Sequence, residues 1–308
     1  MKGARERAWV LLPLPFVAWS LWSIAHGSRR WEHFALLGIA PALAYAGART
    51  QALLVLLYPF GLVGILYDAM RFVRNAGLTP SRVHVCSLHA LEQRFFGVAG
   101  TTIPEWWARH ASLPLDVYCA IPYGSFVFAC IGFAVYLFAT DVPAMRRFAW
   151  AFLFLNVLGF ATYHVYPAAP PWYYETHGCF VDLAARASEG PNLARVDQLL
   201  GIGYFHALYG RASDVFGAIP SLHVAYPLLI ALEAIRRPGW FVRIGSISFF
   251  LSMVFAAVYL QHHWVIDVVV GLAYAISVHA IVSARLTRFE TRRQQKTRRL
   301  TLSGEGAR

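Results

Sequence analysis

Long apolar runs separated by short polar segments make up most of the chain. About 17–25 apolar residues are needed to cross a bilayer as a helix. Candidate runs lie at 8–25, 34–48, 52–67, 117–139, 148–166, 219–235, 240–260 and 264–284. The second and third are short and could together form one re-entrant unit. The pattern predicts an all-α, polytopic transmembrane bundle of about eight spans.

The first apolar run has two possible interpretations. It could be a cleaved signal, because basic residues precede it and Ser-Ile-Ala at 23–25 resembles a cleavage site. Its length and its three tryptophans favour a retained helix. We therefore expect one membrane-embedded domain over 1–284, followed by a basic cytoplasmic tail over 285–308.

The composition excludes most other classes of protein. The chain is 58 % hydrophobic and 14 % charged, whereas a soluble chain carries about 25 % charged residues. Too few charged residues remain to cover the surface of a soluble globule of this size. The composition also excludes a disordered chain, a coiled coil and a disulfide-rich secreted module. The net charge of +11 is concentrated in the tail, and a basic tail after an apolar span is typical of an anchor at anionic lipid rather than of nucleic-acid binding.

The basic residues also predict how the chain is oriented in the membrane. Most of them fall in the segments 1–7, 49, 141–147 and 236–243 and in the tail. Positive residues concentrate on the cytoplasmic side, so we expect both termini to be cytoplasmic. The long loops 68–116 and 167–218 would then face the periplasm, exterior or lumen.

Polar residues interrupt the apolar pattern most densely around 259–267. On a helix His263 and Asp267 would be four residues apart and share a face. The carboxylate could hold one imidazole N–H and leave the other ring nitrogen free to meet a substrate. The alternatives are a buried His–Asp pair that ties two helices together, and a metal site, for which the ligand set is poor.

A second group of functional residues lies where the outer loop enters the sixth run. Pro220 suits the first turn of a helix, the free N–H groups of that turn attract anions, and Ser221 could add a hydroxyl donor. In the predicted topology His223 lies at the same membrane face as His263. Two interfacial histidines beside an anion-binding helix start predict a phosphoryl-transfer site.

The two histidine segments also resemble a known family. Pro-Ser-Leu-His at 220–223 and His-Trp-Val-Ile-Asp at 263–267 resemble the last two signature motifs of the type 2 phosphatidic acid phosphatase superfamily. Within it, 217–223 and 259–263 look most like the inositol phosphorylceramide synthase branch. The resemblance implies a six-helix catalytic core with its active site at the extracytoplasmic rim.

Two further segments look similar to the same branch, so that the resemblance covers about 67–271. They are Tyr-Pro-Ala-Ala-Pro-Pro-Trp at 166–172 and Tyr-Asp-Ala-Met-Arg at 67–71. Tyr166 and Trp172 could line a headgroup pocket or belong to an interfacial aromatic belt. Cys86 and Cys179 both fall on the outer loops, where an oxidising compartment would permit a disulfide.

The chain departs from the superfamily in its phosphate-binding cations. The usual first motif is Lys, six residues, then Arg-Pro, and both lysines here lie too near the termini to supply it. Ala257 stands where the third motif has an arginine. These losses favour the transferase branch. Arg71 and Arg74 are our candidates for the missing cations, although each could instead be an interfacial snorkelling arginine.

The resemblance implies transfer of a phosphoryl-headgroup from a phosphatidylinositol-like donor to a ceramide or diacylglycerol-like acceptor. We expect His263 to attack phosphorus, Asp267 to hold its tautomer and His223 to protonate the departing oxygen, through a phosphohistidine and without metal or cofactor. One alternative is a lipid phosphate or polyprenyl-diphosphate phosphatase that uses water as acceptor. Another is a transporter that uses the His–Asp pair as a proton relay.

Overall fold

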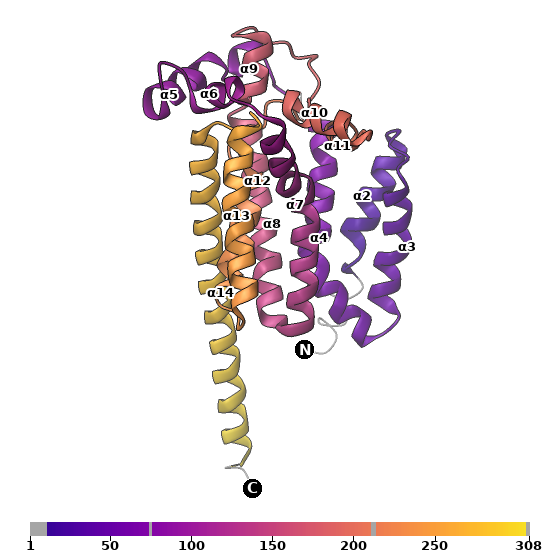
Figure 1. Cartoon of the computed structure of the whole chain (residues 1–308). Helices are drawn as coiled ribbons and strands as arrows, with labels where there is room; N and C mark the ends of the chain where they lie inside the picture. Colours follow the sequence, from indigo (N-terminus) through magenta and orange to yellow (C-terminus); the bar gives the residue numbers. More distant parts are fainter. Residues whose placement is uncertain (1–10, 74–75, 211–213, 306–308) are drawn as a thin grey trace. The chain divides into compact units, whose positions relative to one another are not determined.

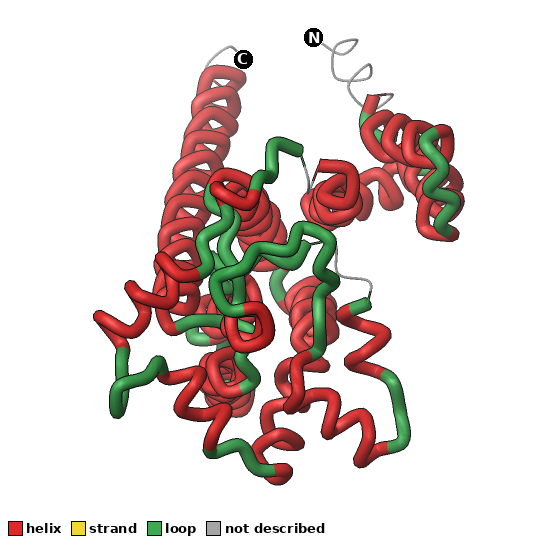
Figure 2. Tube along the Cα trace, turned by 90° about the horizontal axis from the view of Figure 1, so that it is seen from above, coloured by secondary structure: helices red, strands yellow, loops and turns green. Residues whose placement is uncertain are grey.

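A computed structural model describes residues 11–73, 76–210 and 214–305. Helices joined by turns make up this part of the chain, as the view from above shows, and its β-type contacts are isolated bridges (Figure 2). The chain divides into two compact units, Met1–Ala76 and Gly77–Arg308. The predicted all-α class is confirmed.

The described residues of the first unit form three helices, α2 (Leu14–Ala25), α3 (Trp31–Tyr45) and α4 (Ala48–Val73). They pack around buried Phe16, Ala40, Ala44 and Leu54. With 26 residues α4 is long enough to cross a membrane. The short third run predicted at 52–67 is therefore part of a longer helix, which continues through Asp68 and Arg71.

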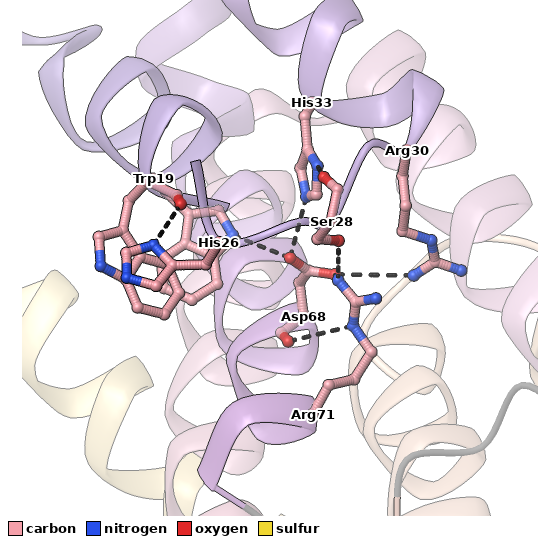
Figure 3. A network of polar contacts seen from close by, with 8 residues as sticks. Trp19, His26, Ser28, Arg30, His33, Asp68 and Arg71 are labelled. Atoms are coloured by element: carbon pink, nitrogen blue, oxygen red, sulfur yellow. Dashed lines mark hydrogen bonds and ion pairs between the residues drawn. The ribbon is translucent and has the colours of Figure 1, made fainter. Parts of the chain in front are cut away.

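A polar network explains why α4 can continue through these charges (Figure 3). Asp68 forms an ion pair with Arg71 one turn further along the helix. It also accepts hydrogen bonds from Trp19 Nε1 of α2 at 3.1 Å and from His33 Nε2 of α3 at 3.0 Å. Because its carboxylate is shared among these donors, the helix need not end where the apolar run ends.

The second unit contains a bundle of helices that run side by side (Figure 1). They are α7 (Leu113–Thr140), α8 (Val142–Val165), α12 (Leu222–Ala234), α13 (Trp240–Tyr259) and α14 (Val265–Glu305). In the described part of the chain, five helices are long and apolar enough to span a membrane: α4, α7, α8, α13 and the first part of α14. α2 and α12 are apolar but shorter. The protein is thus a polytopic integral membrane protein.

α14 extends well beyond the span predicted to end at 284. It continues to Glu305 through the basic tail (Figure 1). Arginine, lysine, glutamine and leucine all favour helix, and the segment 285–303 holds neither glycine nor proline. The change from apolar to basic composition therefore alters the surface of the helix without ending it.

Short helices gather at the end of the bundle opposite the C-terminus (Figure 1). They are α5 (Cys86–Phe96), α6 (Ile103–Arg109), α9 (Pro171–His177), α10 (Gly190–Leu200) and α11 (Tyr204–Tyr209), with a 3₁₀ turn at Pro80–Arg82. A disulfide joins Cys86 to Cys179, with a Cα–Cα distance of 5.4 Å. It ties the start of α5 to the segment after α9, a pairing that the sequence left open. We call these short helices and their linkers the cap.

Candidate active site

Two histidines from distant parts of the sequence meet where the bundle joins the cap. His223 lies in the first turn of α12 and is half-buried, and His263 lies in the turn between α13 and α14 and is 4 % exposed. His223 Nδ1 and His263 Nε2 are 3.0 Å apart. The structure therefore brings together the two residues that the sequence placed at one membrane face.

The partners of His263 determine which of its nitrogens carries the proton. Its Nδ1 lies 2.9 Å from the backbone carbonyl oxygen of Ala218. A carbonyl can only accept, so Nδ1 carries the hydrogen and Nε2 has the free lone pair. The Nδ1–H of His223 donates to that lone pair. His263 thus presents an unprotonated Nε2, as a nucleophile requires.

Asp267 is fully buried in the first turn of α14. Its Oδ2 lies 3.5 Å from His263 Nδ1 and accepts a hydrogen bond from the backbone N–H of Trp264 at 2.8 Å. The sequence predicted that His263 and Asp267 lie on one helix, but His263 precedes the first residue of α14. Asp267 therefore caps its own helix, and the Ala218 carbonyl is the closer partner of His263.

The proline-rich segment after α8 supports the Ala218 carbonyl. The Ala168 N–H donates to Phe216 O at 2.7 Å, and the Ala218 N–H donates to Ala168 O at 3.1 Å. Ala169 is joined in the same way to the carbonyl of His84. Since proline cannot continue a helix, the segment stays extended and aligns the two strands of backbone beside it.

The two aromatic residues of this segment lie in the same supporting structure. The Tyr166 ring stacks on His84, with ring centroids 3.8 Å apart. Trp172 is buried at 7 % exposure in an apolar cluster with Val83 and Phe216. Its backbone N–H donates to Gln261 O at 3.0 Å, two residues before His263. Their predicted role as pocket residues stays a prediction.

Ser221 is the N-cap of α12. Its Oγ accepts the backbone N–H of Val224 at 3.4 Å, and its own N–H donates to Asp267 O at 2.9 Å. Pro220 therefore precedes the cap, and the prediction that it lies in the first helical turn was wrong by two positions. The reason is that the Ser221 side chain satisfies a first-turn N–H, which sets the helix start.

His262 has a different environment from its neighbour. It packs against the rings of Tyr123 and Tyr209, and its Nε2–H donates to Glu189 O at 3.0 Å. Burial lowers the pKa of His262 to about 3, so the ring is neutral at physiological pH. The Tyr123 ring also stacks on His223 at 4.5 Å. The sequence analysis missed both tyrosines; a tyrosine after Pro122 within an apolar span was the available signal.

Neither candidate phosphate-binding arginine belongs to the second unit. Arg71 belongs to the first unit, where it pairs with Asp68 and donates to Ser28 Oγ at 3.0 Å (Figure 3). Arg74 lies outside the described residues. A cation that the sequence analysis missed is Arg195 on α10, whose Nε donates to the buried carboxylate of Asp116 at 2.8 Å.

This geometry supports a two-histidine phosphoryl transfer. The tautomer of His263 is fixed because acceptors lie beside its Nδ1–H, and His223 next to it can exchange a proton with a substrate. Carboxylate, carbonyl and imidazoles are largely removed from water, which strengthens the charge interactions that a phosphoryl group would make.

Comparison with known proteins identifies the family. Residues 86–281 match the PAP2 superfamily. The phosphoinositol dihydroceramide synthase of Bacteroides thetaiotaomicron is 36 % identical over 254 residues, which cover 80 % of this chain and 82 % of that protein. The inositol phosphorylceramide synthase catalytic subunit of Schizosaccharomyces pombe is 30 % identical over 219 residues, 69 % of this chain and 49 % of that protein.

The corresponding catalytic subunit of Saccharomyces cerevisiae is 34 % identical over 184 residues. These cover 58 % of this chain and 45 % of that protein, so the chain spans about half the length of the two yeast relatives. No solved structure matches the chain. The predicted resemblance is thereby confirmed: the chain is a membrane enzyme of the phosphotransferase type and belongs to the PAP2 superfamily, the type 2 phosphatidic acid phosphatases.

Proposed function

We propose that the protein transfers phosphoinositol from a phosphatidylinositol-like donor to the hydroxyl of a ceramide-type lipid. The main structural support is the contact between His223 and the unprotonated Nε2 of His263. The names of the relatives give the headgroup and the acceptor class. Transfer, rather than hydrolysis, also agrees with Ala257 standing where the superfamily has a phosphate-binding arginine.

In the first half-reaction, His263 Nε2 attacks phosphorus and forms an N–P bond. The bond from phosphorus to the glycerol oxygen breaks, and His223, entering the step as the imidazolium, donates a proton to that oxygen, which leaves as diacylglycerol; His223 is left as the neutral base. Positive charge develops on the His263 ring, and the buried carboxylate of Asp267 offsets it at 3.5 Å. The Ala218 carbonyl keeps Nδ1 protonated throughout.

In the second half-reaction, the acceptor hydroxyl attacks the same phosphorus. Its proton passes to His223, its oxygen forms the new O–P bond, and the N–P bond breaks, so that His263 is restored. His223 therefore serves as acid and then as base, and both protons are accounted for.

The contact between the two histidines must open during this cycle. Phosphorus has to approach Nε2 along its lone pair, and His223 Nδ1 occupies that direction at 3.0 Å. Substrate binding therefore displaces His223 from His263. His223 is the ring that moves, because it is half-buried whereas His263 is held at Nδ1 by the Ala218 carbonyl.

We place the active site on the extracytoplasmic side. The cap carries the disulfide between Cys86 and Cys179, and disulfides persist in oxidising compartments. The predicted orientation from the basic residues supports the same side. Both termini would then be cytoplasmic.

The function is tested with the purified full chain, phosphatidylinositol labelled in the inositol ring, and ceramide. Label should pass to a lipid that survives mild alkali, because ceramide holds its chain through an amide whereas phosphatidylinositol holds its chains through esters. The His263→Ala variant should give no such lipid. If labelled water-soluble inositol phosphate is released equally with and without ceramide, the protein is a hydrolase and the proposal is wrong.

A further inference from the structure

Glu92 of α5 makes an unusual contact with the catalytic turn. Its side chain is fully buried, and its two carboxylate oxygens accept the backbone N–H groups of Val265 at 2.9 Å and of Ile266 at 3.1 Å. These are the first two residues of α14. A residue more than 170 positions earlier in the chain therefore caps the helix that follows His263.

We propose that Glu92 is a positioning residue for the nucleophile: by capping α14 it keeps Asp267 available to His263. The inference rests on the proposed function, in which His263 attacks phosphorus. It assigns Glu92 no contact with substrate.

The argument begins with competition for carboxylate oxygens. A helix start presents backbone N–H groups that need acceptors, and here they belong to Trp264, Val265 and Ile266. Asp267 Oδ2 takes the N–H of Trp264, and Glu92 takes the other two. Asp267 Oδ1 has no hydrogen-bond partner among the described residues. Without Glu92, the two orphaned donors would draw Asp267 towards themselves and away from His263.

The cap holds Glu92 rigidly enough for this role. The disulfide fixes the first residue of α5. One turn along, His89 stacks on Tyr174 of α9. Leu88, which shares a helix face with Glu92, packs in the same cluster as Trp264. α5 is therefore anchored to α9, to the segment after α9 and to the catalytic turn itself.

Electrostatics make the role of Glu92 measurable. Burial raises the pKa of Glu92 to about 7, in spite of the two backbone hydrogen bonds, and the nearby charge of Asp267 on α14 contributes to the rise. His89 of α5 is engaged by Glu105, and α9 presents Tyr174 to that face of α5. Glu92 therefore ionises near neutral pH, and only the ionised form offers both oxygens fully as acceptors.

Stability and activity should respond oppositely to this ionisation. The folded-state pKa lies above the ordinary value of 4.5, so the folded state binds the proton more tightly and stability falls as pH rises from about 4.5 to 7. The rate of nucleophilic attack should rise over pH 6 to 8, because ionised Glu92 holds the turn.

The test compares Glu92→Gln with Glu105→Gln. Glu105 is a matched control because it also caps a helix, accepting from the Thr102 N–H at 2.8 Å, but its helix α6 carries no proposed catalytic group. Although burial acts against it, hydrogen bonds from Thr101, Thr102 and His89 lower the pKa of Glu105 to about 2. Glu105 therefore does not titrate near neutral pH.

The probe is p-nitrophenyl phosphoinositol with radioactive phosphorus, and the readouts are the rate of protein labelling from pH 5.5 to 8.5 and the Tm in detergent. Glu92→Gln should label about tenfold to hundredfold more slowly at pH 8, without the step near pH 7 and without a lower Tm at pH 8. Glu105→Gln should keep the wild-type labelling rate and the step near pH 7, but its Tm should be lower.

Two results would overturn the proposal. One is a Glu92→Gln variant that keeps the wild-type rate and pH profile. The other is a variant in which Tm and rate fall together while the step near pH 7 persists, since that is the signature of a purely structural cap. Labelling does not need a lipid acceptor, so a protein that labels but makes no ceramide product would contradict the proposed function and leave the role of Glu92 intact.

Discussion

His263 is distinguished from the adjacent His262 by what its ring nitrogens meet. Both are buried, but His262 donates to a backbone carbonyl and packs between tyrosine rings, whereas His263 directs its unprotonated Nε2 at another imidazole. A carbonyl and a carboxylate both lie at Nδ1 of His263. Two acceptors thus fix the tautomer, and the carboxylate adds the negative charge that the proposed, positively charged phosphohistidine intermediate would need.

The division of labour between the histidines can be tested with the same activated diester. The His263→Ala variant should trap no acid-labile label. The His223→Ala variant should still trap label, because p-nitrophenolate leaves without a proton, and the intermediate should persist because the base for the acceptor is gone. The His262→Ala variant should label normally but melt at lower temperature. If His262→Ala abolishes labelling and His263→Ala does not, the nucleophile is misassigned.

The Asp267→Asn variant should lose less activity than a serine-protease triad does on the same change. The Ala218 carbonyl still holds the Nδ1 proton of His263, so the loss comes from the missing negative charge. We expect a fall of about a hundredfold to a thousandfold in labelling rate. An unchanged rate would show that Asp267 serves only as a cap of α14.

Arg71 remains our candidate for a phosphate-binding cation, and its ion pair with Asp68 shapes the test. In the Arg71→Ala variant, Asp68 keeps His33 and Trp19 as donors, so folding should survive. We expect substrate use to fall about tenfold to a hundredfold, as for the loss of one charge-assisted contact worth about 1.5–3 kcal/mol. The measurement is kcat/KM for the diester beside Tm, and an unchanged kcat/KM would remove Arg71 from the site.

At the scale of elements, the site depends on how closely α14 approaches the start of α12. Gly271 lies one turn after Asp267, and a Cβ there would lie 2.5 Å from the backbone oxygen of Ser221. The Ser221 N–H donates to Asp267 O at the same crossing. Because His223 and Asp267 both flank this contact, the spacing of the two helices sets the spacing of the proposed catalytic groups.

The Gly271→Ala variant should therefore separate the two helices. Overpacking of this kind costs about 1–3 kcal/mol of stability, and we expect the labelling rate to fall at least about tenfold as the histidines move apart. Gly132→Ala in α7 is the control, because a Cβ there meets nothing within 4 Å and alanine favours helix. Equal rates for both variants would contradict this interpretation of the crossing.

At the scale of the whole molecule, the orientation in the membrane decides which compartment the histidines face. Reporters fused after Arg147 and after Arg308 should read cytoplasmic, because both positions follow basic segments and positive residues concentrate on the cytoplasmic side. A reporter within 175–201 should read extracytoplasmic. A cytoplasmic signal from 175–201 would contradict the proposed extracytoplasmic location of the active site. Labelling of free thiols after reduction provides an independent check, since Cys86 and Cys179 should react only when reduced.

Much of the architecture could be predicted from the sequence, because each helix that crosses a bilayer requires a long apolar run along the chain. Every predicted apolar run overlaps a helix among the described residues, and the errors lie at the ends: α4 runs past Asp68, and α14 runs through the basic tail. Helix boundaries depend on partners that lie elsewhere in the chain, such as His33 for Asp68. Hydropathy cannot report such partners.

The sequence by itself determined the membrane class, the resemblance to a phosphotransferase family and the candidate residues His223, His263 and Asp267, because these follow from local composition and fixed spacing. Only the tertiary structure decided what each residue contacts: that the Ala218 carbonyl fixes the His263 tautomer, that Tyr123 stacks on His223, and that Glu92 caps α14. Each of these contacts joins segments far apart along the chain. Their geometry depends on packing and backbone hydrogen bonding, which no single segment encodes.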